Sequence, residues 1–181
     1  MARVVLVTGG SRSGKSAYAQ GLAEGMPGRR EFVATCPPID EELRARIGRH
    51  RAAREGRGWE TLEEAVDLAG VVRGAREYGV LLIDCLTLWV NNLMYEAERE
   101  GRGVEEAEVE GRCREALAAC AERPGAVIFV TNEVGMGIVP ENPASRRFRD
   151  LAGRCNQVMG AGADEVTLVV CGAPVKVKGG G

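Results

Sequence analysis

Short apolar runs alternate with longer stretches of mixed polarity along this chain. The runs with the length and continuous hydrophobicity of buried strands are residues 4–7, 31–36, 80–84, 126–131 and 165–170. The intervening stretches indicate helices over residues 16–23, 40–54, 63–76, 104–123 and 145–159, with a partly apolar stretch around residues 88–94. This alternation predicts an α/β fold, a mostly parallel sheet with helices on both faces. We expect a single domain over residues 1–181, with a short extended tail at residues 172–178.

A glycine-rich sequence follows the first apolar run. Gly9-Gly10-Ser11-Arg12-Ser13-Gly14-Lys15-Ser16 fits the phosphate-binding pattern G-x-x-x-x-G-K-[ST] at every fixed position. In this pattern the glycines let backbone N–H groups turn toward phosphate oxygens, the lysine neutralises the β- and γ-phosphates, and the serine hydroxyl binds Mg²⁺. The helix expected after the loop also favours an anion at its N-terminus. We therefore predict a nucleoside triphosphate site here, rather than a glycine-rich turn that matches by chance.

A carboxylate ends the clearest interior strand. Asp84 follows the run Val80-Leu81-Leu82-Ile83, and the carboxyl ends of parallel strands face the ligand crevice of such sheets. Asp84 can therefore reach the Mg²⁺ held by Ser16, as the second nucleotide-binding carboxylate of P-loop proteins does. The alternative is a turn aspartate that caps the next helix. We predict a metal site formed by Ser16 and Asp84.

Composition narrows the class of protein. The formal net charge of −2 gives no overall attraction to nucleic acid or to an anionic membrane. The first residues lack the longer apolar core of a signal peptide, and no apolar stretch approaches the length of a membrane span. The six cysteines include no C-x-x-C pair, so we expect no zinc site but reduced, mostly buried thiols. These features predict a cytoplasmic protein.

The only histidine, His50, lies in a segment rich in arginine. The arginines around it are Arg44, Arg46, Arg49, Arg51, Arg54 and Arg57. They fit a nucleic-acid contact, although no interleaved aromatic residues or wider positive charge support one. They equally fit a bound triphosphate, beside an imidazole that is largely neutral and nucleophilic at neutral pH. Spacing alone leaves His50 either incidental or catalytic.

Several motifs together resemble one enzyme family. They are the P-loop sequence, Arg49-His50-Arg51 with Trp59-Glu60-Thr61-Leu62-Glu63, Leu82-Ile83-Asp84-Cys85-Leu86-Thr87-Leu88-Trp89-Val90-Asn91-Asn92, Thr131-Asn132-Glu133-Val134-Gly135-Met136-Gly137-Ile138-Val139-Pro140 and Gly172-Ala173-Pro174. In this order they are similar to the bifunctional adenosylcobinamide kinase/adenosylcobinamide-phosphate guanylyltransferases of cobalamin biosynthesis. The resemblance covers nearly the whole chain.

The resemblance implies one nucleotide site that serves two reactions. ATP or GTP phosphorylates adenosylcobinamide, and GTP then transfers GMP to the product through a GMP–histidine intermediate, releasing pyrophosphate. His50 occupies the position of the nucleophile, and Lys15 stabilises the phosphates. The implied nucleotide contacts are Gly9, Gly10, Ser11, Arg12, Ser13, Gly14, Lys15, Ser16, Ala34, Thr35, Cys36, Arg51, Ala52, Ala53, Arg54, Glu63 and Asp84. A RecA-like sheet with an antiparallel edge strand and a homotrimer are also implied.

Two interpretations remain open for each of three further residues. Asn132 and Glu133 follow a predicted strand and either position an attacking group or close the loop. Trp89 is expected in the core or at a subunit interface, rather than as a platform for a corrinoid.

Two other functions use some of the same residues. The first is an ordinary small-molecule P-loop kinase in which His50 is incidental. The second is a nucleotide-dependent switch, or a nucleic-acid-associated ATPase, that uses the arginines as its contact surface.

Overall fold

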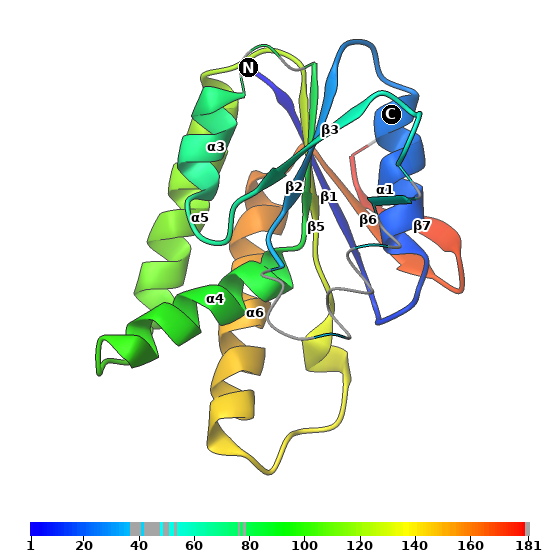
Figure 1. Cartoon of the computed structure of the whole chain (residues 1–181). Helices are drawn as coiled ribbons and strands as arrows, with labels where there is room; N and C mark the ends of the chain where they lie inside the picture. The colour runs from blue at the N-terminus through cyan, green and yellow to red at the C-terminus, as the bar shows by residue number, and fades with distance from the viewer. Residues whose placement is uncertain are drawn as a thin grey trace.

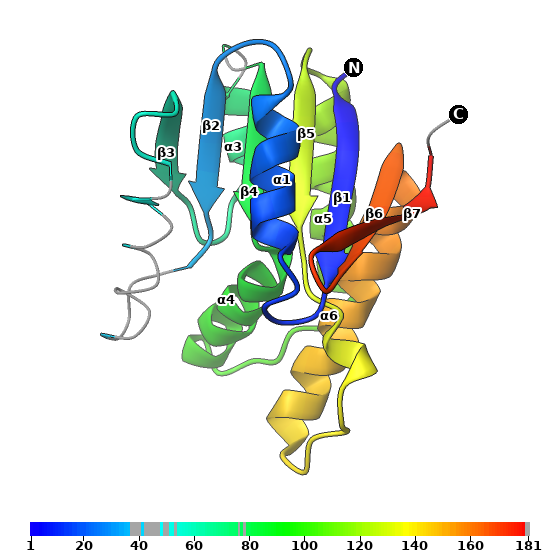
Figure 2. The same ribbon diagram turned by 90° about the vertical axis from the view of Figure 1, so that its right-hand side faces the viewer.

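A seven-stranded sheet forms the centre of the structure, a computed structural model that describes residues 1–36, 41, 48, 51–52, 54–75, 77 and 79–179 (Figures 1 and 2). Its strand order is β3-β2-β4-β5-β1-β6-β7. The strands are β1 (Arg3–Gly9), β2 (Arg30–Ala34), β3 (Trp59–Glu63), β4 (Val80–Asp84), β5 (Ala126–Val130), β6 (Glu165–Val170) and β7 (Ala173–Lys178). Only β7 runs antiparallel, to β6, among the described pairings. The predicted mostly parallel sheet with an antiparallel edge strand is confirmed.

Helices cover both faces of this sheet, as expected. The described helices are α1 (Lys15–Glu24), α3 (Leu68–Gly74), α4 (Leu86–Arg99), α5 (Glu106–Ala121), α6 (Pro143–Gly162) and the 3₁₀ helix η1 (Val134–Met136). Figure 2 shows α1 in front of the sheet and α3 and α5 behind it. Alternate residues of a strand point to opposite faces, so Val5 and Val7 of β1 pack with α1 while Leu6 packs in the cluster of α5 and α6.

The segment between residues 59 and 76 differs from the helix that the sequence predicts over residues 63–76. Trp59–Glu63 is instead the edge strand β3, paired in parallel with β2, and α3 begins only at Leu68. The side chain of Asp67 caps α3 by accepting a hydrogen bond from the N–H of Gly70. Four of the five β3 residues are exposed, so the strand lacks the apolar run that marks the buried strands. The segment predicted as a helix over residues 40–54 lies mostly outside the described residues.

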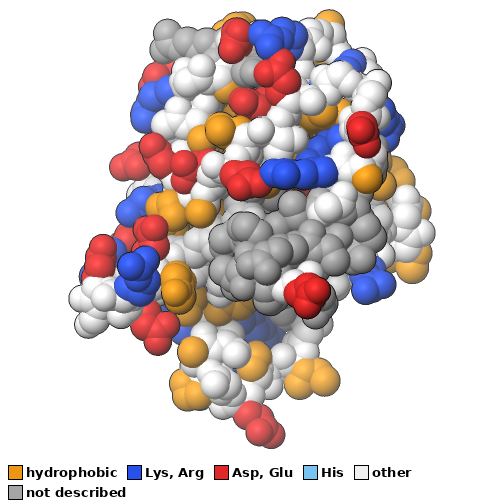
Figure 3. Space-filling model, viewed as in Figure 1, with side chains coloured by type: hydrophobic (Ala, Val, Ile, Leu, Met, Phe, Trp, Pro, Cys, Tyr) orange, Lys and Arg blue, Asp and Glu red, His pale blue; other side chains and the backbone are white. Residues whose placement is uncertain are grey.

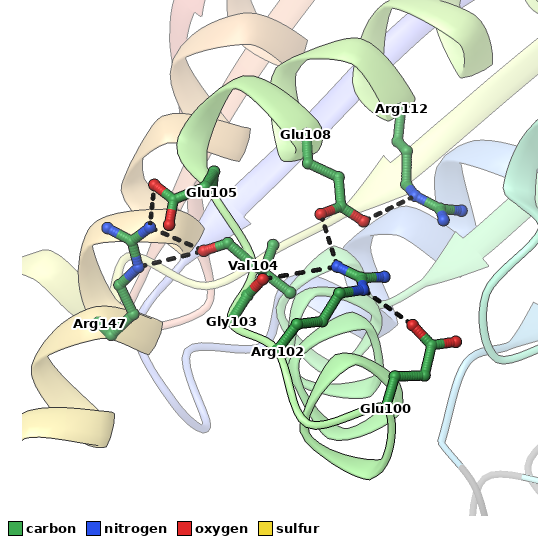
Figure 4. Close-up of polar contacts among 8 residues, drawn as sticks. All are labelled: Glu100, Arg102, Gly103, Val104, Glu105, Glu108, Arg112 and Arg147. Atoms are coloured by element: carbon green, nitrogen blue, oxygen red, sulfur yellow. Dashed lines mark hydrogen bonds and ion pairs between the residues drawn. The ribbon is translucent and has the colours of Figure 1, made fainter.

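Acidic and basic side chains are interspersed on the face of the molecule shown in Figure 3, and many form ion pairs. Figure 4 shows one such group at the connection between α4 and α5. Arg102 binds Glu100 and Glu108, with N–O distances of 2.8 and 3.0 Å. Arg147 of α6 donates to the carbonyl of Val104 at 2.7 Å. The start of α6 is therefore tied to the α4–α5 connection.

Two expectations from the sequence, on the cysteines and on Trp89, are tested by the packing. None of the six cysteines, all of which are described, is in a disulfide, and Cys85, Cys113, Cys120 and Cys155 are buried. Trp89 is buried, and its indole N–H donates to the carbonyl of Val66, so it belongs to the core. Among the residues that the structure describes, no helix has the combined length and hydropathy of a membrane span.

Candidate nucleotide-binding site

The P-loop, residues 9–16, joins β1 to α1 at the carboxyl end of the sheet (Figure 2). Gly14 has a left-handed backbone (φ 94°) that glycine adopts without strain, and α1 starts directly after it. Because Gly14 has no side chain, the first N–H groups of α1 are left for an anion. Lys15 is only 8% exposed, and its ammonium donates to the carbonyl of Gly10 at 3.0 Å. The loop therefore has the geometry that the motif predicts.

The turn between β6 and β7 packs directly against this loop. The N–H of Gly172 donates to the carbonyl of Ser13 at 2.8 Å. A Cβ atom built on Gly14 would lie 3.3 Å from the Cα of Gly172, a contact tighter than most side chains tolerate. The loop is thus braced by a hairpin that lies near the other end of the sequence.

Asp84 ends β4, and hydrogen bonds tie this strand end to the end of β2. The N–H of Thr35 donates to the carbonyl of Asp84 at 3.3 Å. The hydroxyl of Thr35 donates to the carbonyl of Cys85 at 2.8 Å and accepts from the N–H of Cys85 at 2.7 Å. The amide of Asn92 donates to the carbonyl of Thr35 at 2.7 Å. These hydrogen bonds therefore fix the backbone at the half-buried Asp84.

A second polar cluster lies at the end of β5, which separates β4 from β1 in the sheet. The hydroxyl of Thr8 donates to the carboxylate of Glu133 at 2.5 Å, and the N–H of Glu133 donates to the carbonyl of Gly9 at 3.3 Å. The side-chain amide of Asn156 donates to the same carboxylate at 3.2 Å and to the carbonyl of Asn132 at 3.0 Å. Glu133 is thus fixed against the P-loop, consistent with both interpretations of its role.

Arg54 lies over the middle of β2 and β3, on the face of the sheet that α1 covers, and its Nη2 donates to the hydroxyl of Thr61 at 3.4 Å. Its side chain is 4% exposed, and its guanidinium lies 3.5 Å from the centre of the Phe32 ring. The pKa of Arg54 is lowered, mainly by burial, while the charge of Asp84 raises it and that of Arg51 lowers it further. Within the described part of the chain its Nε and Nη1 atoms are buried without a hydrogen-bond partner. A buried guanidinium with unused donors is suited to an anionic ligand beside it.

An exposed ion pair joins two further residues of the predicted site. Arg51 contacts the carboxylate of Glu63, and both side chains are about half exposed. Glu63 ends β3 opposite Ala34, the last residue of β2, so it too reaches the carboxyl edge. Ala52 is exposed nearby in the sequence. His50 and Ala53 lie outside the described residues.

A family model described as cobinamide kinase / cobinamide phosphate guanyltransferase matches residues 5–177 of the chain. The chain belongs to this family. The bifunctional adenosylcobalamin biosynthesis protein CobU of Escherichia coli is 40% identical over 97% of this chain and 99% of its own length. The corresponding CobU of Salmonella typhimurium is also 40% identical over 97% and 99%, and CobP of Pseudomonas aeruginosa is 41% identical over 96% of each chain. A solved KaiC-like protein of Pyrococcus horikoshii aligns over 92% of this chain and 70% of its own, with 16% identity and a TM-score of 0.48.

For a member of the cobinamide kinase family, the structure gathers most of the predicted site at one edge. The P-loop, the ends of β2 and β3 with Ala34, Thr35 and Glu63, and Asp84 all lie at the carboxyl ends of parallel strands. Sequence reasoning missed Thr8 and Asn156 as members of the cluster around Glu133. The available signal was Asn156 itself, a polar residue directly after the buried Cys155 on the inner face of α6.

The oxygen donors at this edge fit a Mg²⁺ ion. Mg²⁺ is usually bound by one or two protein oxygens together with the phosphates of the nucleotide. Ser16 on the first turn of α1 and the half-buried Asp84 supply a hydroxyl and a carboxylate of this kind. No group of three or more His, Cys, Asp or Glu side chains is assembled for a metal in the described ranges. A magnesium–nucleotide complex needs no such group.

Proposed function

We propose that this protein phosphorylates adenosylcobinamide with ATP or GTP and then transfers GMP from GTP to adenosylcobinamide phosphate. The products of the second step are adenosylcobinamide-GDP and pyrophosphate. Beyond the family relationship, one observation supports the proposal. The P-loop and Asp84 lie at the carboxyl edge of one sheet, and the charge of Asp84 acts on the buried Arg54, so one triphosphate site can serve both reactions.

In the kinase step, the hydroxyl oxygen of the substrate attacks the γ-phosphorus and the bond to the β-phosphate oxygen breaks. Lys15 and the backbone N–H groups of the P-loop hold the phosphates in line for this attack. Ser16 and Asp84 would hold Mg²⁺, which when bound neutralises charge on the β- and γ-phosphates. Lys15 exchanges its hydrogen bond to Gly10 for one to a phosphate oxygen.

In the guanylyl transfer step, His50 is proposed as the nucleophile. Its imidazole attacks the α-phosphorus, and pyrophosphate leaves while Lys15 and the loop amides stabilise its charge. A phosphate oxygen of adenosylcobinamide phosphate then displaces the imidazole from the GMP group. This route divides one difficult transfer into two easier ones.

The remaining contacts of the nucleotide belong to the same proposal. Glu63 accepts hydrogen bonds from N1–H and the amino group of guanine, which favours guanine over adenine. The other proposed contacts are Ala34, Thr35, Cys36, Arg51, Ala52, Ala53 and Arg54. We also propose that the enzyme is cytoplasmic, and that it is a homotrimer, as the family resemblance implies.

Covalent labelling tests this function. Incubation with Mg²⁺ and GTP labelled with ³²P at the α-phosphate should leave label on the denatured chain, whereas γ-labelled GTP should leave none because pyrophosphate departs. The bond between phosphorus and imidazole is labile in acid, so mild acid should release the label and alkali should not. His50→Ala should abolish labelling and guanylyl transfer but retain part of the kinase activity.

Other outcomes would assign a different function. Acid-stable label, or normal guanylyl transfer by His50→Ala, would place the nucleophile elsewhere. A simple kinase and a nucleotide-dependent switch would both leave the chain without α-label. Salt-sensitive binding of nucleic acid would favour the arginine segment as a contact surface.

A further inference from the structure

The loop after η1 exposes a group of large apolar side chains. Met136 is 78% exposed, Ile138 94% and Val139 60%. Single exposed apolar residues are ordinary on a protein surface, but three within four positions form a local patch, which usually marks a contact surface. We call residues 135–141, which carry this patch, the apolar loop.

The apolar loop borders the nucleotide site. It continues the chain directly from Glu133, whose carboxylate accepts from Thr8 and whose N–H donates to Gly9 of the P-loop. Figures 1 and 2 both place η1 and the chain leading to α6 at the end of the sheet where β1 passes into α1. Figure 3 shows hydrophobic side chains at this lower end of the molecule. A molecule that approaches the phosphates from this end would meet the apolar loop.

Hydrogen bonds from α6 hold the backbone of the apolar loop at both ends. Arg149 donates to the carbonyl of Gly135 at 2.6 Å. Arg146 donates to the carbonyls of Pro140 and Glu141 at 3.0 and 2.5 Å. The apolar side chains are therefore displayed on a fixed backbone. A surface that is already ordered loses little conformational entropy when a ligand binds.

We propose that the apolar loop binds the corrin ring of the acceptor substrate, with Met136, Ile138 and Val139 in contact with it. This inference rests on the proposed function, in which the acceptor hydroxyl must reach the γ-phosphate while the nucleotide occupies the P-loop. The macrocycle, which is far larger than its reacting arm, must then lie beside the P-loop. A corrin ring presents methyl groups and apolar edges between its amide side chains, and it matches an apolar surface of fixed shape.

Substitution of the patch tests this assignment. Met136→Ser combined with Ile138→Ser should raise the KM for adenosylcobinamide roughly tenfold or more, since two large apolar contacts are lost. The KM for the nucleotide should stay within about twofold, because a uniform binding contact to the other substrate is removed. The matched control is Val177→Ser, which alters a 62% exposed valine on β7 near the opposite end of the sheet. It should change neither value.

Two measurements without turnover separate this inference from the proposed function. Equilibrium dialysis with adenosylcobinamide, detected by its own absorbance, should show weaker binding by the double variant than by the unsubstituted protein. Covalent labelling by GTP without acceptor should be unchanged in the double variant. If the unsubstituted protein is not labelled at all, the proposed function is refuted. If both proteins bind the corrinoid equally well, only the role of the apolar loop is refuted. A changed oligomeric state with unchanged corrinoid binding, measured by light scattering, would instead assign the loop to a contact between subunits.

Discussion

Lys15 is buried, although its charge has to reach a phosphate. Burying an ammonium group is costly unless the group is hydrogen-bonded, and the carbonyl of Gly10 supplies such a bond from the same loop. Lys15 is also the first residue of α1, so its backbone is fixed by the helix. The charge is therefore already placed at the P-loop before a nucleotide arrives, and both proposed reactions depend on it.

Replacement of this lysine tests whether one site serves both reactions. Lys15→Ala should lower the kinase and the guanylyl transfer activity together, by about 2–4 kcal/mol of transition-state stabilisation each. Steady-state rates of the two reactions, measured separately with the same protein, check this. Lys176→Ala is the control, because Lys176 pairs with Glu165 on the surface of the β6–β7 hairpin. Near-normal activity of Lys15→Ala in either reaction would contradict a shared site.

The sequence predicts those parts of the site that are contiguous or that end an apolar run. The P-loop and Asp84 are of this kind, because local spacing defines them. The cluster of Thr8, Glu133 and Asn156 is different, because its members come from β1, the end of β5 and α6 and meet only when the sheet has formed. The burial of Arg54 against Phe32 also cannot be predicted from the sequence, because there Arg54 is just one of several arginines in a basic segment.

Among the secondary-structure elements, the β6–β7 hairpin has the most direct effect on the P-loop. The close approach of Gly14 to Gly172 leaves no space for a side chain, and the left-handed backbone of Gly14 disfavours one independently. Any added atom at Gly14 must move either the P-loop or the hairpin turn.

A single methyl group should therefore be costly at this position. Gly14→Ala should lower the free energy of unfolding by about 1–3 kcal/mol and weaken nucleotide binding, as measured by urea denaturation and by titration with GTP. Gly111→Ala, in the interior of α5 where a Cβ would meet no atom within 4 Å, should change the free energy of unfolding in the opposite direction. It should stabilise the protein by about 0.5–1 kcal/mol. Equal stability of the two variants would show that the hairpin and the P-loop are not tightly packed.

The strands that the sequence identifies are those with helices over both faces. β5 is buried at every position and reads as one apolar run. Among the described strands β3 pairs only with β2, and it is mostly solvent-exposed, so its polar residues Glu60, Thr61 and Glu63 leave no such run. The tail expected at residues 172–178 becomes a strand because it pairs with β6, which the sequence alone does not show.

The six thiols are divided unevenly between the core and the surface of the molecule. Cys85 lies in the core on the α1 side, and Cys113, Cys120 and Cys155 lie in the core on the opposite face. Cys171 is exposed on the β6–β7 turn, and Cys36 is partly exposed. Burial raises the pKa of Cys85 and of Cys120 to about 12 each, so neither forms a reactive thiolate near neutral pH.

Thiol titration should follow this distribution. At pH 8, a disulfide reagent such as DTNB should react quickly with Cys171 and more slowly with Cys36, and with the four buried cysteines only after unfolding in denaturant. Cys171→Ser should remove the fast phase, and GTP should slow the reaction of Cys36 if this residue contacts the nucleotide. Rapid reaction of the buried thiols in the native protein would show that the two core clusters open readily.

The hydrogen bond between Gly172 and Ser13 has a consequence for the synthesis of the chain. The ribosome makes the P-loop before the hairpin, and the N–H group that holds the Ser13 carbonyl is added more than 150 residues later. A nascent chain thus carries the complete phosphate-binding motif long before the motif has its final support. We therefore expect firm binding of a nucleotide only after Gly172 has been added, because a chain interrupted before this residue has the motif but not the hydrogen bond that supports it.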